Sequence, residues 1–162
     1  MTALRPTLRK ALSIDAPRIT RIYIESWNAG FEKLMPLQNY SPELVQRWEQ
    51  DLGDVSRQWW IAELGNTMVG FVGVGPSRDP HEAKLGELDT IAVVPIWWRK
   101  KIGQLLMTKA VSLLTHQGYQ EAVLWTLADY ERGQKFYESM GWRQDGGVRD
   151  EGKQIRYRYS LK

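Results

Sequence analysis

The densest cationic run of the sequence, Arg99-Lys100-Lys101, directly precedes a predicted helix. The first N–H groups of a helix have no intrahelical partner, and the helix dipole favours an anion beside them. Gly103 carries no side chain where a backbone would have to approach oxygen atoms closely. We therefore expect a seat for a phosphate or pyrophosphate group at this helix start. The alternative is a surface turn whose cations are simply solvated.

Two carboxylates, Glu87 and Asp89, lie two positions apart in a predicted strand. Residues two apart in a strand share a face, so these acids should point the same way as Ile91 and Val93. Carboxyl groups among apolar neighbours have a raised pKa, which suits a general base. The alternatives are that both acids face solvent at the start of the strand, or that they only attract a cationic substrate.

The elements that must position these residues follow from hydrophobic periodicity and turn residues. Gly65-Asn66 separates two apolar runs as in a β-hairpin, whereas a strand, helix and strand over residues 85–127 predict a parallel crossover. The sequence therefore predicts one α/β domain over residues 1–162 with a mixed sheet. The expected strands are 7–12, 59–64, 67–74, 85–94, 122–127, 142–148 and 154–161, and the expected helices begin near 15, 41, 102 and 130.

Composition excludes several kinds of site. The 162 residues contain no cysteine and only two histidines, His81 and His116, so neither a thiolate nucleophile nor a resident metal is expected. The net charge of +3 is too small and too dispersed to favour nucleic acid. No apolar run is long enough for a membrane span, and the first residues lack the apolar stretch of a secretory signal. A cytoplasmic protein is therefore expected.

Two separated motifs carry a family resemblance. The first is Ala92-Val93-Val94-Pro95 with the following Arg99-Lys100-Lys101-Ile102-Gly103, and the second is Phe136-Tyr137 with Gly141-Trp142. Together with the order of elements over nearly the whole chain, they resemble the GNAT superfamily of N-acetyltransferases. The resemblance implies a GNAT-like central sheet of about seven strands with about four helices and a splayed parallel strand pair. Lys101 replaces a usual glycine, and Trp98 replaces a usual Arg or Gln.

The resemblance also implies acetyl-CoA as cosubstrate, with no metal. The backbone of Ile91–Val93, with Ala92 at its centre, should bind the pantetheine arm, and the strand carrying it should splay from residues 122–127. Tyr130 stands where many relatives have Asn, in the cofactor site. The backbone from Arg99 to Gln104 should cradle the pyrophosphate, which covers Arg99, Lys100, Lys101, Ile102, Gly103 and Gln104.

The chemistry follows from the same resemblance. Tyr137 would protonate the departing thiolate, although its spacing also fits a core aromatic residue. Glu87 would be the base, with Asp89 or a water relay as alternatives. An N–H near Val93 would polarise the thioester carbonyl.

The expected reaction moves an acetyl group from acetyl-CoA to a primary amine of a small molecule or peptide, by direct attack in a ternary complex. Trp27, Phe31, Tyr40 and Trp59 are candidate lining residues for the acceptor, or alternatively core residues. The acidic Glu25 and Glu32 would suit a cationic amine, or alternatively are only solvated surface charges. A homodimer is left open, and neither a membrane nor nucleic acid is an expected partner. The alternative function is a non-catalytic module that senses CoA, or binds RNA through Trp97–Lys101.

Overall fold

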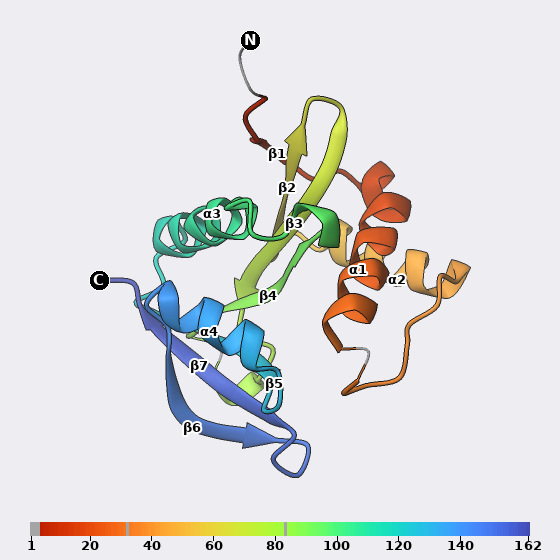
Figure 1. Ribbon diagram of the computed structural model, residues 1–162. Helices are drawn as coiled ribbons and strands as arrows, with labels where there is room; N and C mark the ends of the chain where they lie inside the picture. The colour runs from red at the N-terminus through yellow and green to blue at the C-terminus, as the bar shows by residue number, and fades with distance from the viewer. Residues whose placement is uncertain (1–3, 32, 83) are drawn as a thin grey trace.

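One mixed sheet of seven strands runs through the protein in the order β1-β2-β3-β4-β5-β7-β6 (Figure 1). The computed structural model describes residues 4–31, 33–82 and 84–162. Every neighbouring pair of strands is antiparallel except β4 and β5, which are parallel. The mixed sheet and the parallel pair are as the sequence predicts. The strands are β1 (Thr7–Lys10), β2 (Gln58–Leu64), β3 (Thr67–Pro76), β4 (Gly86–Val93), β5 (Glu121–Leu127), β6 (Arg143–Arg149) and β7 (Gln154–Ser160).

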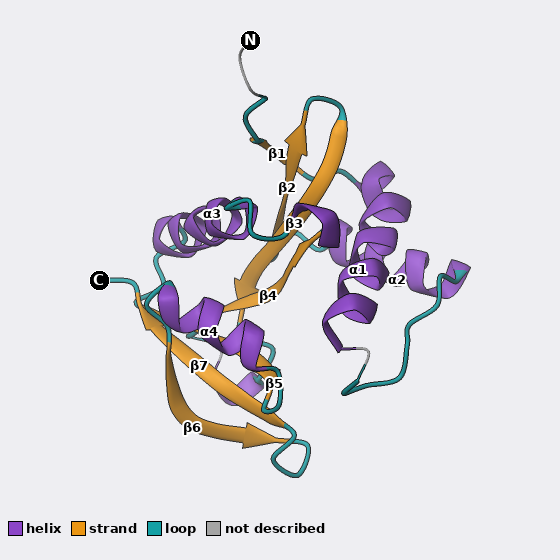
Figure 2. Cartoon of the chain, in the orientation of Figure 1, coloured by secondary structure: helices purple, strands orange, loops and turns teal. Residues whose placement is uncertain are grey.

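Four α-helices cover the two faces of this sheet (Figure 2). α1 (Ala16–Phe31) and α2 (Pro42–Gly53) lie together on one face, whereas α3 (Ile102–His116) and α4 (Glu131–Ser139) lie on the other. Each face has its own core. The smaller core packs α1 and α2 on β2 and β3, and the larger core packs α3 and α4 on β3, β4, β5 and β7. The short 3-10 helices are η1 (Ser13–Asp15), η2 (Pro80–Glu82) and η3 (Pro95–Trp97).

Local sequence signals explain where several elements begin and end. The Ser41 hydroxyl accepts a hydrogen bond from the Leu44 N–H at 3.1 Å, and Pro42 occupies the first position of α2. Gly65 has a φ of 59°, which allows the tight turn between β2 and β3. Within α3 the fully buried positions recur every three or four residues, so this helix presents one apolar face to the sheet.

None of the helices in the described ranges is both long and apolar enough to cross a membrane.

Candidate active site

β4 departs from regular pairing near its middle. Against β3, Leu88 lies opposite Val74 and Thr90 lies opposite Gly73, so the register skips Asp89. One extra residue in one strand of an antiparallel pair is a β-bulge, which bends the strand and increases its twist. The bulge therefore changes the direction of β4 between its first and second halves.

The bulge also changes which face the side chains occupy. Leu88, Ile91 and Val93 all pack against the larger core, beneath α3. Asp89 instead belongs to ion pairs that reach α2 on the opposite face, and Glu87 lies beside it. The two acids do share a face, as predicted, but the expectation that Ile91 and Val93 share it is wrong. The extra residue shifts the alternation by one position.

β4 and β5 separate soon after they begin. Their parallel pairing is limited to Gly86 opposite Ala122 and Glu87 opposite Val123. From Leu88 onward the facing edges of the two strands diverge, so the backbone groups of β4 that point toward β5 lack a strand partner. The splayed parallel pair that the sequence predicts is confirmed, and it leaves an open strand edge in the centre of the sheet.

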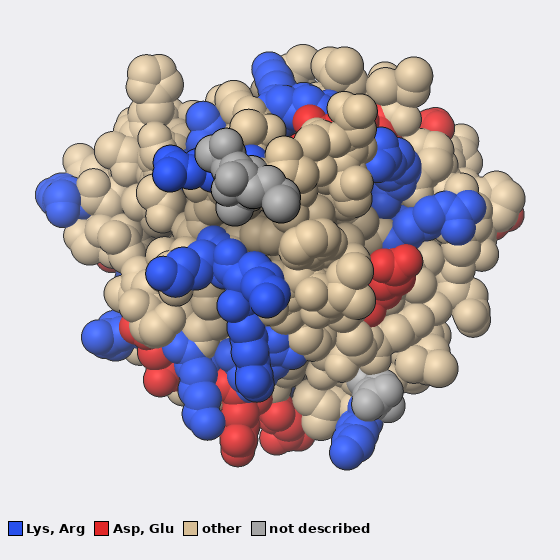
Figure 3. Space-filling view, turned by 45° about the horizontal axis from the view of Figure 1, so that its top comes forward, with Lys and Arg blue, Asp and Glu red and all other residues tan. Residues whose placement is uncertain are grey.

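A cavity of about 610 Å³ occupies this opening. Because the sheet is split here, the cavity is lined from both faces: by α1 on one side, and by α4 and the loop before α3 on the other. Figure 3 shows a band of Lys and Arg side chains across the middle of the surface, beside a hollow. Lining residues with charged side chains are Asp89, Arg99, Lys101, Arg132, Lys135 and Arg149.

The loop between η3 and α3 has an unusual backbone. Arg99 and Lys101 have φ values of 62° and 67°, in the left-handed region that favours glycine. Lys101 immediately precedes α3 and makes no side-chain cap, so the first N–H groups of this helix remain available to an external acceptor. Both cations line the cavity. The loop therefore offers backbone donors, a helix N-terminus and positive charge to the same space.

Trp98 closes this loop against β4. Its indole Nε1 donates to the Val93 carbonyl oxygen at 2.7 Å, and the Arg132 guanidinium lies 3.5 Å from the ring centroid. The contact links the loop to the open strand edge and to α4. The sequence analysis did not predict this contact, which depends on the presence of Trp at position 98.

Tyr137 projects from α4 into the cavity. Its ring centroid lies 5.7 Å from that of Phe136 and 5.9 Å from that of Tyr157. Burial, and to a smaller extent the neighbouring Tyr130 and Tyr157, raise the pKa of the Tyr137 hydroxyl well above its ordinary value. No described residue forms a hydrogen bond with this hydroxyl. Tyr137 is therefore a protonated, uncommitted O–H group inside the cavity.

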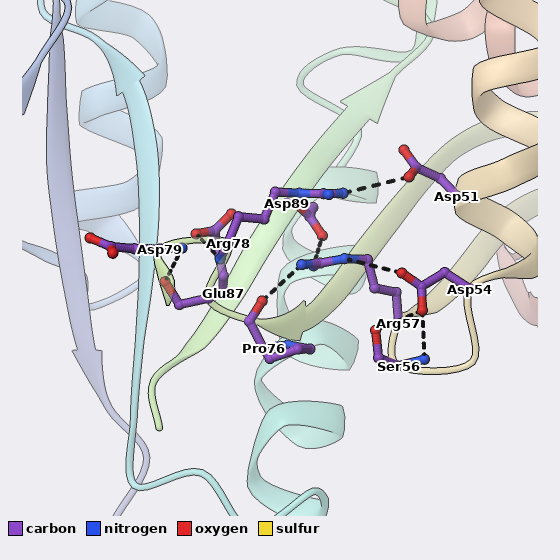
Figure 4. A network of polar contacts seen from close by, with 10 residues as sticks. Asp51, Asp54, Ser56, Arg57, Pro76, Arg78, Asp79, Glu87 and Asp89 are labelled. Carbon is purple, nitrogen blue, oxygen red and sulfur yellow. Dashed lines mark hydrogen bonds and ion pairs between the residues drawn. The ribbon is translucent and has the colours of Figure 1, made fainter. Parts of the chain in front are cut away.

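Glu87 and Asp89 differ sharply in their contacts (Figure 4). Asp89 accepts from the buried Arg57 guanidinium on one oxygen and from Arg78 at 2.7 Å on the other. Glu87 accepts only a long bond of 3.4 Å from the Arg78 backbone N–H. Burial, followed by the charge of Asp89, raises the pKa of Glu87. Asp89 lines the cavity and Glu87 does not, although Glu87 is its neighbour on the same face.

Aromatic rings from α1 form the opposite wall. Tyr23, Trp27 and Phe31 follow one another at four-residue spacing, with ring centroids 5.7 Å and 4.7 Å apart. Phe31 in turn meets Tyr130 of the segment before α4 at 4.6 Å, so the row bridges the splayed sheet. All four rings line the cavity. This wall is largely aromatic.

The comparisons with known proteins agree with this geometry. A family model described as acetyltransferase (GNAT) family matches residues 17–142. The chain belongs to the GNAT family. An uncharacterized N-acetyltransferase of Archaeoglobus fulgidus is 26% identical over 143 residues, which cover 85% of this chain and 92% of that protein. Other curated relatives are longer, and the chain spans 54% of the probable N-acetyltransferase family 8 member 5 of Mus musculus.

Solved GNAT structures share the fold at low identity. The PaiA N-acetyltransferase of Thermoplasma acidophilum, in complex with coenzyme A, has a TM-score of 0.76 at 19% identity, covering 97% of this chain and 99% of that one. The putative acetyltransferase YncA of Salmonella typhimurium, with its cofactor acetyl-CoA, has a TM-score of 0.76 at 17% identity, covering 98% of this chain and 95% of that one.

The GNAT fold brings most of the predicted cofactor residues together. The exceptions are Lys100, which is exposed outside the cavity, and Ile102, whose side chain is 1% exposed in the larger core. Ile102 could contribute only its backbone. The predicted residues that line the cavity are Ile91, Ala92, Val93, Arg99, Lys101, Gly103, Gln104, Tyr130 and Tyr137.

Some of the residues predicted to line the acceptor site do line the cavity, and others do not. Trp27 and Phe31 line the cavity, but Tyr40 is exposed beneath Arg21, and Trp59 is 3% exposed in the smaller core. Glu25 is exposed outside the cavity, and Glu32 lies outside the described residues. Sequence reasoning missed Trp125 and Arg149, which line the cavity from β5 and β6; no spacing signal in either strand singles them out.

Proposed function

We propose that this GNAT protein transfers the acetyl group of acetyl-CoA to a primary amine, by direct attack in a ternary complex. The observation that carries the proposal is the continuous cavity through the splayed sheet. One end offers cations and a helix N-terminus, the other offers an aromatic wall, and the open edge of β4 lies between them. Two substrates that enter from opposite faces would meet at β4 without a covalent enzyme intermediate.

The cationic end fits the features of acetyl-CoA. Its pyrophosphate needs donors and positive charge, which the α3 N-terminus, Arg99 and Lys101 supply. Its pantetheine arm carries two amides, which can pair as an added strand with the edge of Ile91–Val93 that lacks a strand partner, where Trp98 already occupies the Val93 carbonyl oxygen. The left-handed conformation of Arg99 and Lys101 supports this binding, because a backbone that alternates with left-handed residues can point successive N–H groups toward an anion.

The reaction then needs two proton transfers. The amine must first lose a proton, because an alkylammonium has a pKa of about 10.4. Its lone pair attacks the thioester carbonyl carbon, and an N–H near Val93 stabilises the oxygen as it gains charge. When the C–S bond breaks, the sulfur takes the electron pair and Tyr137 donates its proton to the thiolate.

Glu87 is the better of the two carboxylates for receiving the amine proton. Both Asp89 oxygens are occupied by guanidinium groups, whereas Glu87 has one long hydrogen bond and a raised pKa. Since Glu87 lies just outside the cavity wall, we propose that the proton reaches it through a water molecule.

The RNA-binding alternative has less support. Trp97 packs against the larger core, and Arg132 covers one face of Trp98, so these rings do not form an open stacking surface.

The second alternative is a CoA sensor, which would bind acetyl-CoA without consuming it.

A thiol-release assay with a panel of amines, combined with calorimetric titration of acetyl-CoA, separates these functions. Binding with amine-dependent thiol release supports the proposal. Binding without release from any amine supports a sensor, and absence of binding at millimolar acetyl-CoA would exclude both.

A further inference from the structure

The acceptor end of the cavity lies on the same face of the sheet as α1. On β5, Leu124 packs in the larger core, so its neighbour Trp125 points to the opposite face. On β7, Tyr157 also packs in that core, whereas Arg156, which lies opposite Trp125, shares the α1 face. The cavity residues on this face therefore include Trp125, Arg149 and Gln154, together with the aromatic row of α1.

The charge on this face is the opposite of what a cationic acceptor needs. Asp89 is the single carboxylate among the described residues that line the cavity, and Arg57 and Arg78 already neutralise it. Its side chain is 6% exposed. A polyamine or another multiply charged cation would find no uncompensated carboxylate here, and it would meet a guanidinium instead.

That guanidinium belongs to Arg149. It lies 4.3 Å from the centroid of the Trp125 ring, and its Nε donates to the Gln154 side chain at 2.6 Å. Within the described residues it pairs with no carboxylate. Arg156 lies nearby, 5.6 Å from the same ring centroid, but its charge is matched by Glu82 at 2.6 Å and Asp145 at 2.8 Å.

Arg149 is an exposed residue at the rim of the cavity, where the Trp125 ring and the Nε hydrogen bond orient its guanidinium, and its terminal nitrogens have no hydrogen-bond partner among the described residues. A guanidinium held in this way is preorganised to bind a carboxylate with two parallel hydrogen bonds. The rings of Trp27 and Phe31 stand across the same space and suit an apolar or aromatic group.

We infer that the acceptor is a free amino acid with an apolar or aromatic side chain, whose carboxylate binds Arg149 and whose side chain packs on the aromatic wall. This inference rests on the proposed function for the fate of the amine. It concerns the acceptor face alone, and Arg149 is separate from the residues assigned to acetyl-CoA and to proton transfer.

The test compares acceptors that differ only in the carboxylate. L-phenylalanine, L-phenylalaninamide and phenethylamine share the ring and the amine, and spermidine supplies the cationic case. Acetylation of L-phenylalanine should proceed with the highest kcat/KM. The Arg149→Gln variant should lower that value about ten-fold through KM, as expected for loss of a charged hydrogen bond, and should leave phenethylamine unchanged.

Arg143→Gln is the matched control. Arg143 lies on the same strand, but its side chain donates to the backbone carbonyls of Glu138 and Trp142 outside the cavity. This variant should leave all acceptors unaffected. The KM for acetyl-CoA should stay constant in both variants. A higher kcat/KM for spermidine or phenethylamine than for L-phenylalanine would overturn the inference while leaving acetyl transfer intact.

Calorimetric titration of L-phenylalanine into protein saturated with CoA keeps the inference testable even without turnover. Binding that is lost in Arg149→Gln and kept in Arg143→Gln, with no thiol release, would preserve the ligand class and overturn the transfer reaction. Equal binding of L-phenylalanine by all three proteins, or no binding at all, would overturn the assignment of Arg149.

Discussion

Replacing Tyr137 by Phe tests the proposed proton donor with little structural disturbance. The ring packs beside Phe136 and Tyr157, and Phe preserves those contacts. No described residue bonds the Tyr137 hydroxyl, so its removal leaves no buried polar partner unsatisfied. The free energy of unfolding should therefore change by less than about 1 kcal/mol.

The expected effect on turnover is much larger. General acid catalysis contributes roughly 10²- to 10⁴-fold, which corresponds to about 3–5 kcal/mol of transition-state stabilisation. Because its pKa is raised well above the ordinary value, Tyr137 keeps its proton throughout the neutral and mildly alkaline range. The loss in Tyr137→Phe should thus be nearly constant with pH, whereas a group titrating near neutrality would give a loss that varies.

Single-turnover thiol release at saturating acetyl-CoA and amine isolates the chemical step. Tyr157→Phe is the control, since this hydroxyl donates to the Glu138 carboxylate at 2.5 Å and does not line the cavity. It should lower stability by about 1.5–3 kcal/mol and leave the chemical step unchanged. If Tyr137→Phe binds acetyl-CoA normally and reacts within twofold of the parent protein, the role as acid is refuted.

Three further substitutions test other parts of the structure. Glu87→Gln should slow turnover, and it should also remove a pH dependence of the free energy of unfolding. A carboxyl group whose pKa is raised in the folded state contributes to stability when it is protonated, and this contribution is lost as pH rises through the folded-state pKa. A pH series of urea unfolding curves checks the sign. Lys101→Gly should leave the free energy of unfolding equal or up to about 1 kcal/mol higher, because glycine relieves the left-handed backbone strain and so offsets the greater freedom of the unfolded chain. Position 100 has no positive φ, so Lys100→Gly should lower the free energy of unfolding by about 0.5–1 kcal/mol. Gly73→Ala should destabilise by about 3 kcal/mol or more in the same assay, because its Cβ would overlap a buried tryptophan ring of β2, while Gly53→Ala has open space and should not.

The elements with strong local signals were predictable from sequence. The capped start of α2, the Gly65 turn and the apolar face of α3 each follow from a few neighbouring residues. The two GNAT motifs could also be read directly, because they combine backbone requirements with residue types. The cavity residues from β4, the loop before α3 and α4 were found for this reason.

What could not be predicted depends on contacts between segments far apart in sequence. The bulge at Asp89 exists only relative to β3, so no pattern within β4 marks it, and it reversed the expected faces. Trp125 lies on β5 and Arg149 at the end of β6, beyond α4 in the chain, and only the register of β5, β7 and β6 brings them together. Burial of Trp59 and exposure of Tyr40 likewise depend on packing rather than on residue type.

The ion pairs of Asp89, buried toward Arg57 and partly exposed toward Arg78, account for its position in the cavity without a role in proton transfer. Arg57 precedes β2, Arg78 follows β3, and Asp51 and Asp54 belong to α2 and its end. Asp89, the bulged residue of β4, is therefore connected through ion pairs to three other segments: the residues before β2, the residues after β3, and α2. A bulge leaves its extra residue unpaired in the ladder, so side-chain contacts such as these supply the attachment that the strand pairing does not. Since the bulge sets the direction of Ile91–Val93, these ion pairs hold the open strand edge on which acetyl-CoA is proposed to bind.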